Sequence, residues 1–170
     1  VKDLDHFIDF YGTKAPTNIA AIFENGKVVK LPYGDLDMQK IKQHEDGTFA
    51  SALSNDGKVV VGYCKCSNFA YSYPCKWTRG ANNEWKLEQL PLPDTYKYGL
   101  AINVSSDGRT IVGLAMEGGR AIACYWIDGK CYTVNCKSED DELAKMKQMR
   151  MIDMSPNGKY FIFSLSSRSD

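Results

Sequence analysis

Short apolar runs separated by turn-forming residues recur along this chain at a nearly constant spacing. Three segments align without gaps, and each carries a turn motif followed by apolar and β-branched residues: 52–62, 103–113 and 153–163. Their turn glycines, Gly57, Gly108 and Gly158, are 51 and 50 residues apart. Asp or Asn followed by Gly supplies the positive φ of a tight turn, so each segment predicts a β-hairpin. The spacing indicates an internal repeat of about fifty residues.

A second motif recurs out of phase with the first. An aromatic residue, Phe23, Trp77 or Trp126, precedes a glycine by three positions, and these aromatic residues are 54 and 49 residues apart. Two interleaved hairpin motifs at one period predict four antiparallel strands in each repeat. We expect the two tryptophans to cover the core between adjacent sheets, because large aromatic side chains bury the most apolar surface.

The repeat therefore predicts an all-β chain of about three four-stranded antiparallel units of the β-propeller type. We expect a single domain, 1–170, with repeats at about 20–62, 63–113 and 114–165. A β-sandwich is the alternative, because it also contains many short strands, but it does not require a sequence repeat at this period.

The two ends of the repeat array are expected to be complementary. The first strands correspond to the second hairpin of a repeat, and the last strands, around 151–165, correspond to the first hairpin. Closed propellers have about four to eight blades, so three repeats do not close a ring. Either two chains combine as a homodimer of about six blades, or this is a partial propeller within a longer protein.

Composition and charge mainly exclude certain classes of function. The 21 basic and 21 acidic side chains give a formal net charge of zero, which argues against nucleic-acid binding. No apolar stretch approaches the roughly 20 residues needed to cross a bilayer, so no membrane insertion is expected. Val1 does not begin an open reading frame, and we expect that any export signal was removed.

The six cysteines do not have the paired spacing of a zinc site: Cys64, Cys66, Cys75, Cys124, Cys131 and Cys136. No metal and no cofactor is therefore predicted. Buried free thiols are the plainer expectation, because cysteine is a common small core residue. A Cys64–Cys75 disulfide is the alternative, since symmetric pairing across the loop at 67–72 would bring these two residues together.

Catalytic residues are not indicated by any motif. The only histidines are His6, which lies among apolar neighbours, and His44, which lies beside two acids in a polar link. Neither predicts a Ser-His-Asp arrangement. We therefore assign no catalytic residue from the sequence.

Two tyrosine-rich stretches are the best candidates for ligand contact, with Tyr71 and Tyr73 in one and Tyr96 and Tyr98 in the other. Tyrosine offers an apolar ring and a polar tip, which suits a protein or a glycan surface. Ordinary strand packing is the alternative role. The leading functional hypothesis is a non-enzymatic binding module, while a structural segment of a longer surface protein has the same composition. The enzymatic alternative is a hydrolase or lyase with its active site in the central channel of a completed ring.

The aligned motifs resemble two groups of bacterial propeller repeats. The segment 101–113, followed by Ala123 to Trp126, resembles the HAF-type extracellular repeat. The segment 154–160 resembles the Ser-Pro-Asp-Gly-Lys repeat of WD40-like propellers, which include the periplasmic Tol-system propeller. The first two copies carry Asn55 and Ser106 where the third carries Pro156. The resemblance covers about two thirds of the chain and implies an exported bacterial protein, periplasmic or at the cell surface. It implies no active-site residues.

Overall fold

The computed structural model describes residues 18–33, 47–66, 71–118, 120–134 and 148–166. These ranges contain β-strands and no helix, so none of the described residues forms a helix that could cross a membrane. The strands are β1 (Ala21–Glu24), β2 (Lys27–Lys30), β3 (Gly47–Leu53), β4 (Val59–Cys66), β5 (Tyr71–Arg79), β6 (Trp85–Gln89), β7 (Tyr98–Val104), β8 (Thr110–Glu117), β9 (Arg120–Ile127), β10 (Lys130–Thr133), β11 (Gln148–Met154) and β12 (Phe161–Ser166).

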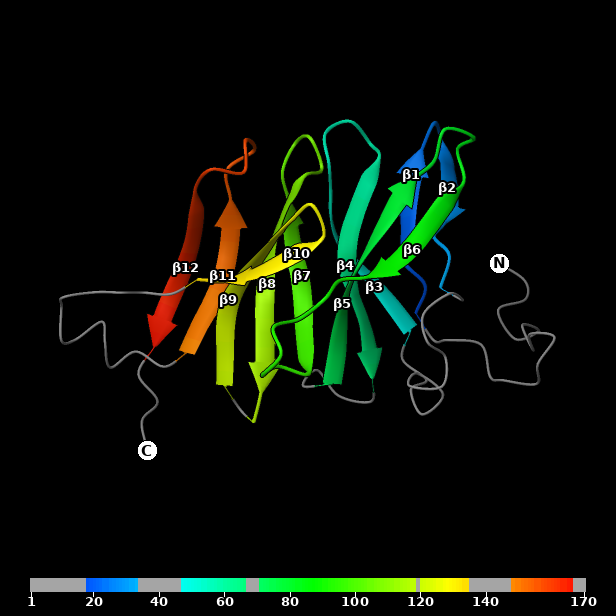
Figure 1. Cartoon of the computed structure of the whole chain (residues 1–170). Helices are drawn as coiled ribbons and strands as arrows, with labels where there is room; N and C mark the ends of the chain where they lie inside the picture. The colour runs from blue at the N-terminus through cyan, green and yellow to red at the C-terminus, as the bar shows by residue number, and fades with distance from the viewer. Residues whose placement is uncertain (1–17, 34–46, 67–70, 119, 135–147, 167–170) are drawn as a thin grey trace.

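The described strands form four small antiparallel sheets that follow one another in chain order (Figure 1). Two sheets have four strands, β3-β4-β5-β6 and β7-β8-β9-β10, and the hairpins β1–β2 and β11–β12 lie at opposite ends of the row. The predictions of an all-β fold and of four-stranded antiparallel units are therefore confirmed. The described strands do not form a closed ring.

The sheets repeat one another down to the irregularities in their strand pairing. Each first hairpin contains a register shift at the equivalent position, between Ala50 and Ala52, Ala101 and Asn103, and Met151 and Asp153. The four-stranded sheets run from 47 to 89 and from 98 to 133. Each repeat as counted along the sequence therefore contains the second hairpin of one sheet and the first hairpin of the next.

A serine closes the turn of three hairpins: β3–β4, β7–β8 and β11–β12. The Oγ atoms of Ser54, Ser105 and Ser155 donate to a side-chain oxygen two residues later, at 2.6, 2.6 and 2.8 Å. The same Oγ atoms accept a hydrogen bond from the backbone amide five residues later, at 3.0, 2.9 and 3.0 Å. Each hydroxyl thus replaces water on two polar partners, which allows Ser54 and Ser105 to be buried.

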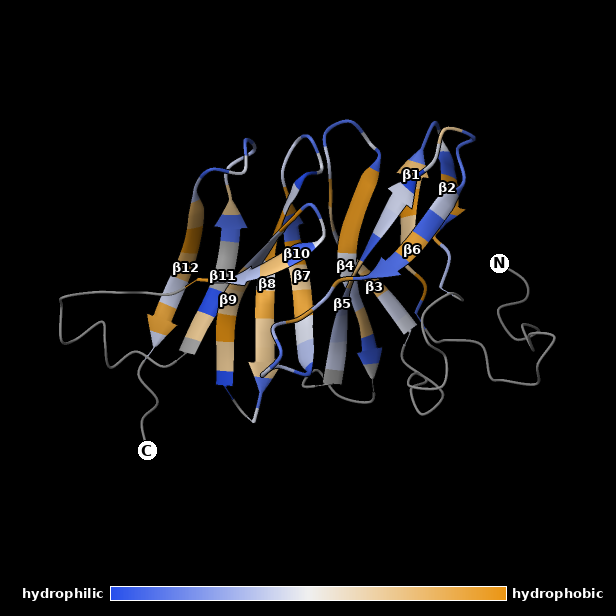
Figure 2. Cartoon of the chain, in the orientation of Figure 1, coloured by the Kyte–Doolittle hydropathy of each residue, from blue (hydrophilic) through white to orange (hydrophobic). Residues whose placement is uncertain are grey.

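Each buried tryptophan lies in the seam between two consecutive sheets. Trp77 packs with Ala20 and Leu31 around the preceding hairpin, and Trp126 packs with apolar residues of the preceding sheet. The indole Nε1 atoms donate to the carbonyl oxygens of Pro32 at 2.7 Å and Pro91 at 2.6 Å. The expectation that these tryptophans cover the core between sheets is confirmed. Hydrophobic residues are correspondingly concentrated along strands such as β8 in the middle of the row (Figure 2).

Replacing a seam tryptophan tests how strongly one sheet is fixed to the next. Trp77→Phe removes the buried indole donor to the partly buried Pro32 carbonyl, and the loss of such a hydrogen bond costs about 0.5–1.5 kcal/mol. We expect a lower free energy of unfolding by at least this amount in urea denaturation. Trp85→Phe is the matched control, because that half-buried ring lies closer to water and should lose less. Equal losses in the two variants would contradict this role of the indole.

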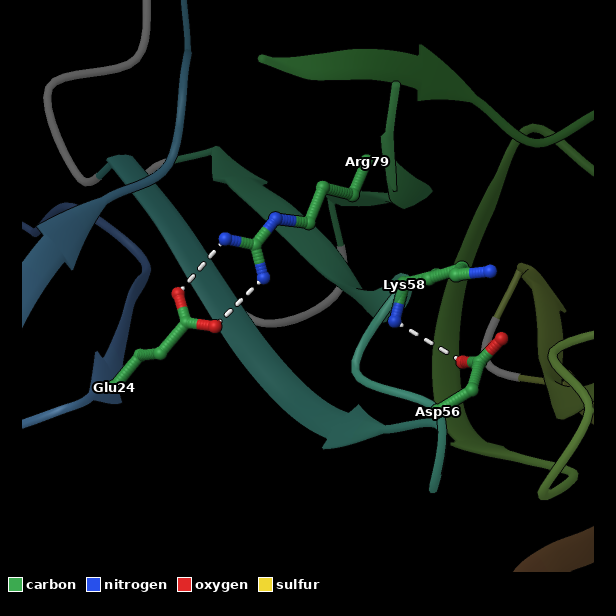
Figure 3. A network of polar contacts seen from close by, with 4 residues as sticks. All are labelled: Glu24, Asp56, Lys58 and Arg79. Carbon is green, nitrogen blue, oxygen red and sulfur yellow. Dashed lines mark hydrogen bonds and ion pairs between the residues drawn. The ribbon is translucent and has the colours of Figure 1, made fainter. Parts of the chain in front are cut away.

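The lowered pKa values of two turn carboxylates predict that the fold is less stable in acid. The hydrogen bond from Ser105 Oγ, followed by that from the Arg109 amide, holds the pKa of Asp107 below its usual value near 3.8. Asp56 is held low in the same way by Ser54 and the Lys58 amide, the latter contact being drawn in Figure 3. A lowered folded-state pKa stabilises the fold above the unfolded value, and this stabilisation is lost as the pH falls through the folded value.

The third turn shows how this acid sensitivity can be removed without breaking the turn. Asn157 accepts the same two hydrogen bonds as Asp107, without a charge. We expect Asp107→Asn to keep the turn and to reduce the fall in unfolding free energy below about pH 4. The reciprocal variant, Asn157→Asp, should make that fall steeper. Urea denaturation between pH 2 and 7 measures both, and unchanged slopes would refute the assignment.

Candidate functional site

The segment between β6 and β7 is held in place by hydrogen bonds along its length. The Leu90 amide donates to the Pro74 carbonyl of β5 at 2.9 Å. The Pro91 carbonyl accepts from Trp126 of the next sheet, and the Tyr96 amide donates to Pro93 at 2.8 Å to close a turn. The segment is therefore positioned by both sheets that it joins, before any ligand is present.

An open pocket of about 590 Å³ lies beside this segment, within the 300–1,000 Å³ range of small-molecule sites. Tyr73 enters it from β5 and Tyr98 from β7, with ring centroids 5.8 Å apart and ring planes inclined by 59°. The pocket therefore spans the seam between the two four-stranded sheets. Its described lining is Tyr73, Gln89, Leu90, Pro91, Leu92, Tyr96, Lys97 and Tyr98.

The polar groups of this pocket suit binding better than acid–base chemistry. Lys97 is the only charged residue in the described lining, and its exposed ammonium group lies 3.5 Å from Oε1 of the partly buried Glu117. The lining contains no carboxylate and no imidazole of its own. No three His, Cys, Asp or Glu side chains of the described ranges converge as metal ligands would.

The structure brings together three of the four tyrosines that the sequence marked for ligand contact. Tyr73, Tyr96 and Tyr98 line one pocket although they lie on two sheets and a link. Tyr71 is in the same strand as Tyr73, but its side chain lies outside the described residues. The histidines His6 and His44 also lie outside the described ranges. A binding role for the tyrosines stays a prediction.

Sequence reasoning missed the apolar wall of the pocket, which includes Leu90, Pro91 and Leu92. A usable signal was present, because a Leu-Pro dipeptide follows the second hairpin at 31–32 and again at 90–91. In both places the proline carbonyl accepts the indole hydrogen bond of the next sheet. The dipeptide therefore marks the seam, and at 90–91 the seam forms one wall of the pocket.

Cys64 and Cys75 lie on the adjacent strands β4 and β5 of the first four-stranded sheet. Cys64 and Cys75 are buried free thiols with their sulfur atoms 3.8 Å apart. The strand register places Cys64 opposite Tyr73 and Cys75 opposite Gly62, so the two thiols are diagonal neighbours on one face. Burial, followed by contact with Cys64, raises the pKa of the Cys75 thiol well above its usual value. A disulfide between them stays a prediction.

Thiol titration separates the two states of this pair. With both side chains as thiols, burial and the raised pKa of Cys75 should make them react far more slowly in the folded protein than in denaturant. We expect all six cysteines to react after denaturation without a reductant. A count of four reacting cysteines would instead indicate one disulfide. If all the remaining cysteines of Cys64→Ala then react, the disulfide joins Cys64 and Cys75. Alanine suits the site because Ala115 occupies the equivalent position in the next sheet.

Comparison with known protein families and with curated proteins found no match to this sequence.

Proposed function

We propose that this chain is a β-propeller-type module in which each four-stranded sheet is one blade. The support is the agreement between the sequence period, the matching register shifts and the equivalent tryptophan seams. A sandwich consists of two sheets packed face to face. In this chain four sheets follow one another, and each contacts the next one in sequence, as between β5 and β7 and between β9 and β11.

We further propose that the module is not an enzyme but binds a glycan in the tyrosine-lined pocket. The observation that carries the proposal is the convergence of Tyr73, Tyr96 and Tyr98 at one seam. Aromatic faces pack against the C–H faces of sugar rings, and phenol, amide and ammonium groups hydrogen-bond sugar hydroxyls. Gln89 and Lys97 supply the amide and the ammonium group at the pocket.

The size of the pocket favours a short glycan over a protein surface. A stable protein interface buries roughly 800 Å² on each partner, which calls for a broad patch. The pocket of about 590 Å³ instead has the volume of a small-ligand site. Because its walls are fixed by backbone hydrogen bonds to both sheets, little ordering is required when the ligand binds.

A hydrolytic role for the tyrosine pocket itself receives less support from these residues. Glycoside hydrolysis usually requires a pair of carboxyl groups flanking the scissile bond. The described lining of the tyrosine pocket provides none, and Glu117, which approaches the pocket residue Lys97, forms an ion pair with it. An exported location, which the repeat resemblance implies, would expose the pocket to periplasmic or cell-surface glycans.

Screening against an array of neutral and acidic oligosaccharides, followed by calorimetry, tests this function. We expect Tyr96→Ala and Tyr98→Ala each to weaken binding about two- to tenfold, as the loss of one aromatic contact of 0.5–1.5 kcal/mol implies. Tyr132→Ala is the matched control, because Tyr132 is an exposed tyrosine on β10 and does not line the pocket.

Two results would contradict the proposal in different ways. Glycan binding that survives both pocket substitutions would place the site elsewhere on the chain. Binding of peptides but of no oligosaccharide, with the same sensitivity to Tyr96 and Tyr98, would keep the pocket and replace the ligand class.

A further inference from the structure

The two ends of the row of sheets expose apolar positions that are buried in every internal sheet. Ile162 of β12 is 57% exposed, whereas Val61 and Val112 at the equivalent position are 0% exposed. Val61 packs into the cluster around the next sheet, and Val112 packs into the cluster that includes β11 and β12. Ile162 therefore faces the place that a following sheet would occupy.

The opposite end shows the complementary pattern. Phe23 of β1 is 75% exposed, whereas the equivalent Trp77 is 0% exposed in the seam with the preceding hairpin. Leu53 is 49% exposed, whereas its equivalents Val104 and Met154 are buried. Phe23 therefore faces the place of a preceding sheet, whereas Leu53, on β3, faces the place of the missing half of the sheet that contains β1 and β2.

The space around the turn glycines shows the same difference between internal positions and the end of the row. A Cβ on Gly108 would lie 2.7 Å from Val59, and one on Gly158 would lie 2.9 Å from Thr110, so each turn packs closely on the turn before it. A Cβ on Gly57 would have none of the described atoms within 4 Å. Tyr160, the equivalent of Val59 and Thr110, is exposed at the far end of the row and is the side chain that belongs beside Gly57.

We propose that a second copy of this chain completes the array, with β12 of one copy pairing antiparallel with β1 of the other. The hairpins β11–β12 and β1–β2 then form one four-stranded sheet from two copies. The occupant is a second copy because this chain carries both halves of that sheet, and they lie at opposite ends of the row (Figure 1). This inference rests on the propeller interpretation, since two such contacts give six blades, within the range that closes a ring.

The internal sheets define the register of the new pairing. Val60 lies opposite Trp77 in β4–β5, and Ile111 lies opposite Trp126 in β8–β9. The equivalent pairing places Phe161 of one copy opposite Phe23 of the other, with Ile162 opposite Ile22. The contact would therefore cover one exposed and one half-buried apolar side chain on each side, Ile162 with Phe161 on one copy and Phe23 with Ile22 on the other.

The first hairpin is already fixed in position to receive the second copy. Arg79 of β5 holds the carboxylate of Glu24 at the end of β1 through two hydrogen bonds of 2.8 and 2.9 Å (Figure 3). The guanidinium group also lies over the Trp85 ring, 5.6 Å from its centroid. Paired, fork-shaped contacts of this kind fix orientation as well as distance, so β1 presents a preset edge.

The mass in solution, measured by light scattering on a sizing column, tests the proposal. We expect a species of twice 19.1 kDa for the native sequence. Ile162→Asp damages one end and Phe23→Asp damages the other, and each should reduce the mass to that of a single copy. Both side chains are exposed within one copy, so circular dichroism should show that the fold is kept.

Mixing the two variants provides the sharper control. In head-to-tail pairing, the intact end of Ile162→Asp meets the intact end of Phe23→Asp, so the mixture should recover species of two copies. A symmetric contact between identical surfaces would not recover on mixing. A native protein that stays a single copy at high concentration would overturn the proposal, as would an open series of ever larger species or a mixture that remains single.

Glycan binding is read separately on the same proteins. The tyrosine pocket lies between β5 and β7 of one copy and contains neither substituted position. A native protein that binds glycan as a single copy would therefore contradict the assembly proposal alone. A native protein that pairs but binds no glycan would contradict the proposed function alone.

Discussion

The hydrogen bond from each buried indole to a proline carbonyl in the preceding link is the interaction on which the rest of this structure depends. Strand pairing alone produces separate small sheets, and an isolated hairpin is marginally stable at best without an apolar face to pack against. Trp77 and Trp126 provide that cover and, through Pro32 and Pro91, fix where the neighbouring sheet ends. The same atoms therefore determine both the packing of the sheets and the path of the chain between them.

The pocket and the unfinished ends follow from this seam. Pro91 is fixed by Trp126, so the link that it begins cannot collapse into the space beside Tyr73 and Tyr98. At the first hairpin the seam position is occupied by Phe23, whose side chain has no N–H donor and which has no preceding sheet among the described residues. A position that fixes the core inside the row becomes an exposed contact at its end.

The sequence predicted the strand arrangement well because the residues that shape it act locally. An Asx-Gly turn needs a positive φ wherever it occurs, and Gly57, Gly108 and Gly158 all adopt one. The serine beside each turn bonds within five residues, so this contact is local as well. The tryptophans were recognised as core residues for their size alone.

The contacts that create the candidate site are nonlocal, and the sequence could indicate only some of its members. Symmetric pairing across a loop put Cys64 directly opposite Cys75, whereas the actual register is shifted and makes them diagonal neighbours. That register is set by the pairing of β4 with β5 along their length, which the spacing of the two cysteines does not determine. Likewise, nothing in the spacing of Tyr73 and Tyr98 indicates that two sheets bring their rings within 5.8 Å.

Equivalent positions in every sheet should be buried in the same way once two copies assemble, including the positions on β1 and β12 at the two ends. Amide hydrogen exchange at residue resolution on β1 and β12, at concentrations that favour assembly, tests it most directly. The account predicts that the outward-facing amides of these two strands are protected as strongly as amides inside β4 and β8. Exchange as fast as in the exposed turns would contradict it, and would mean that the row of sheets ends where the described strands end.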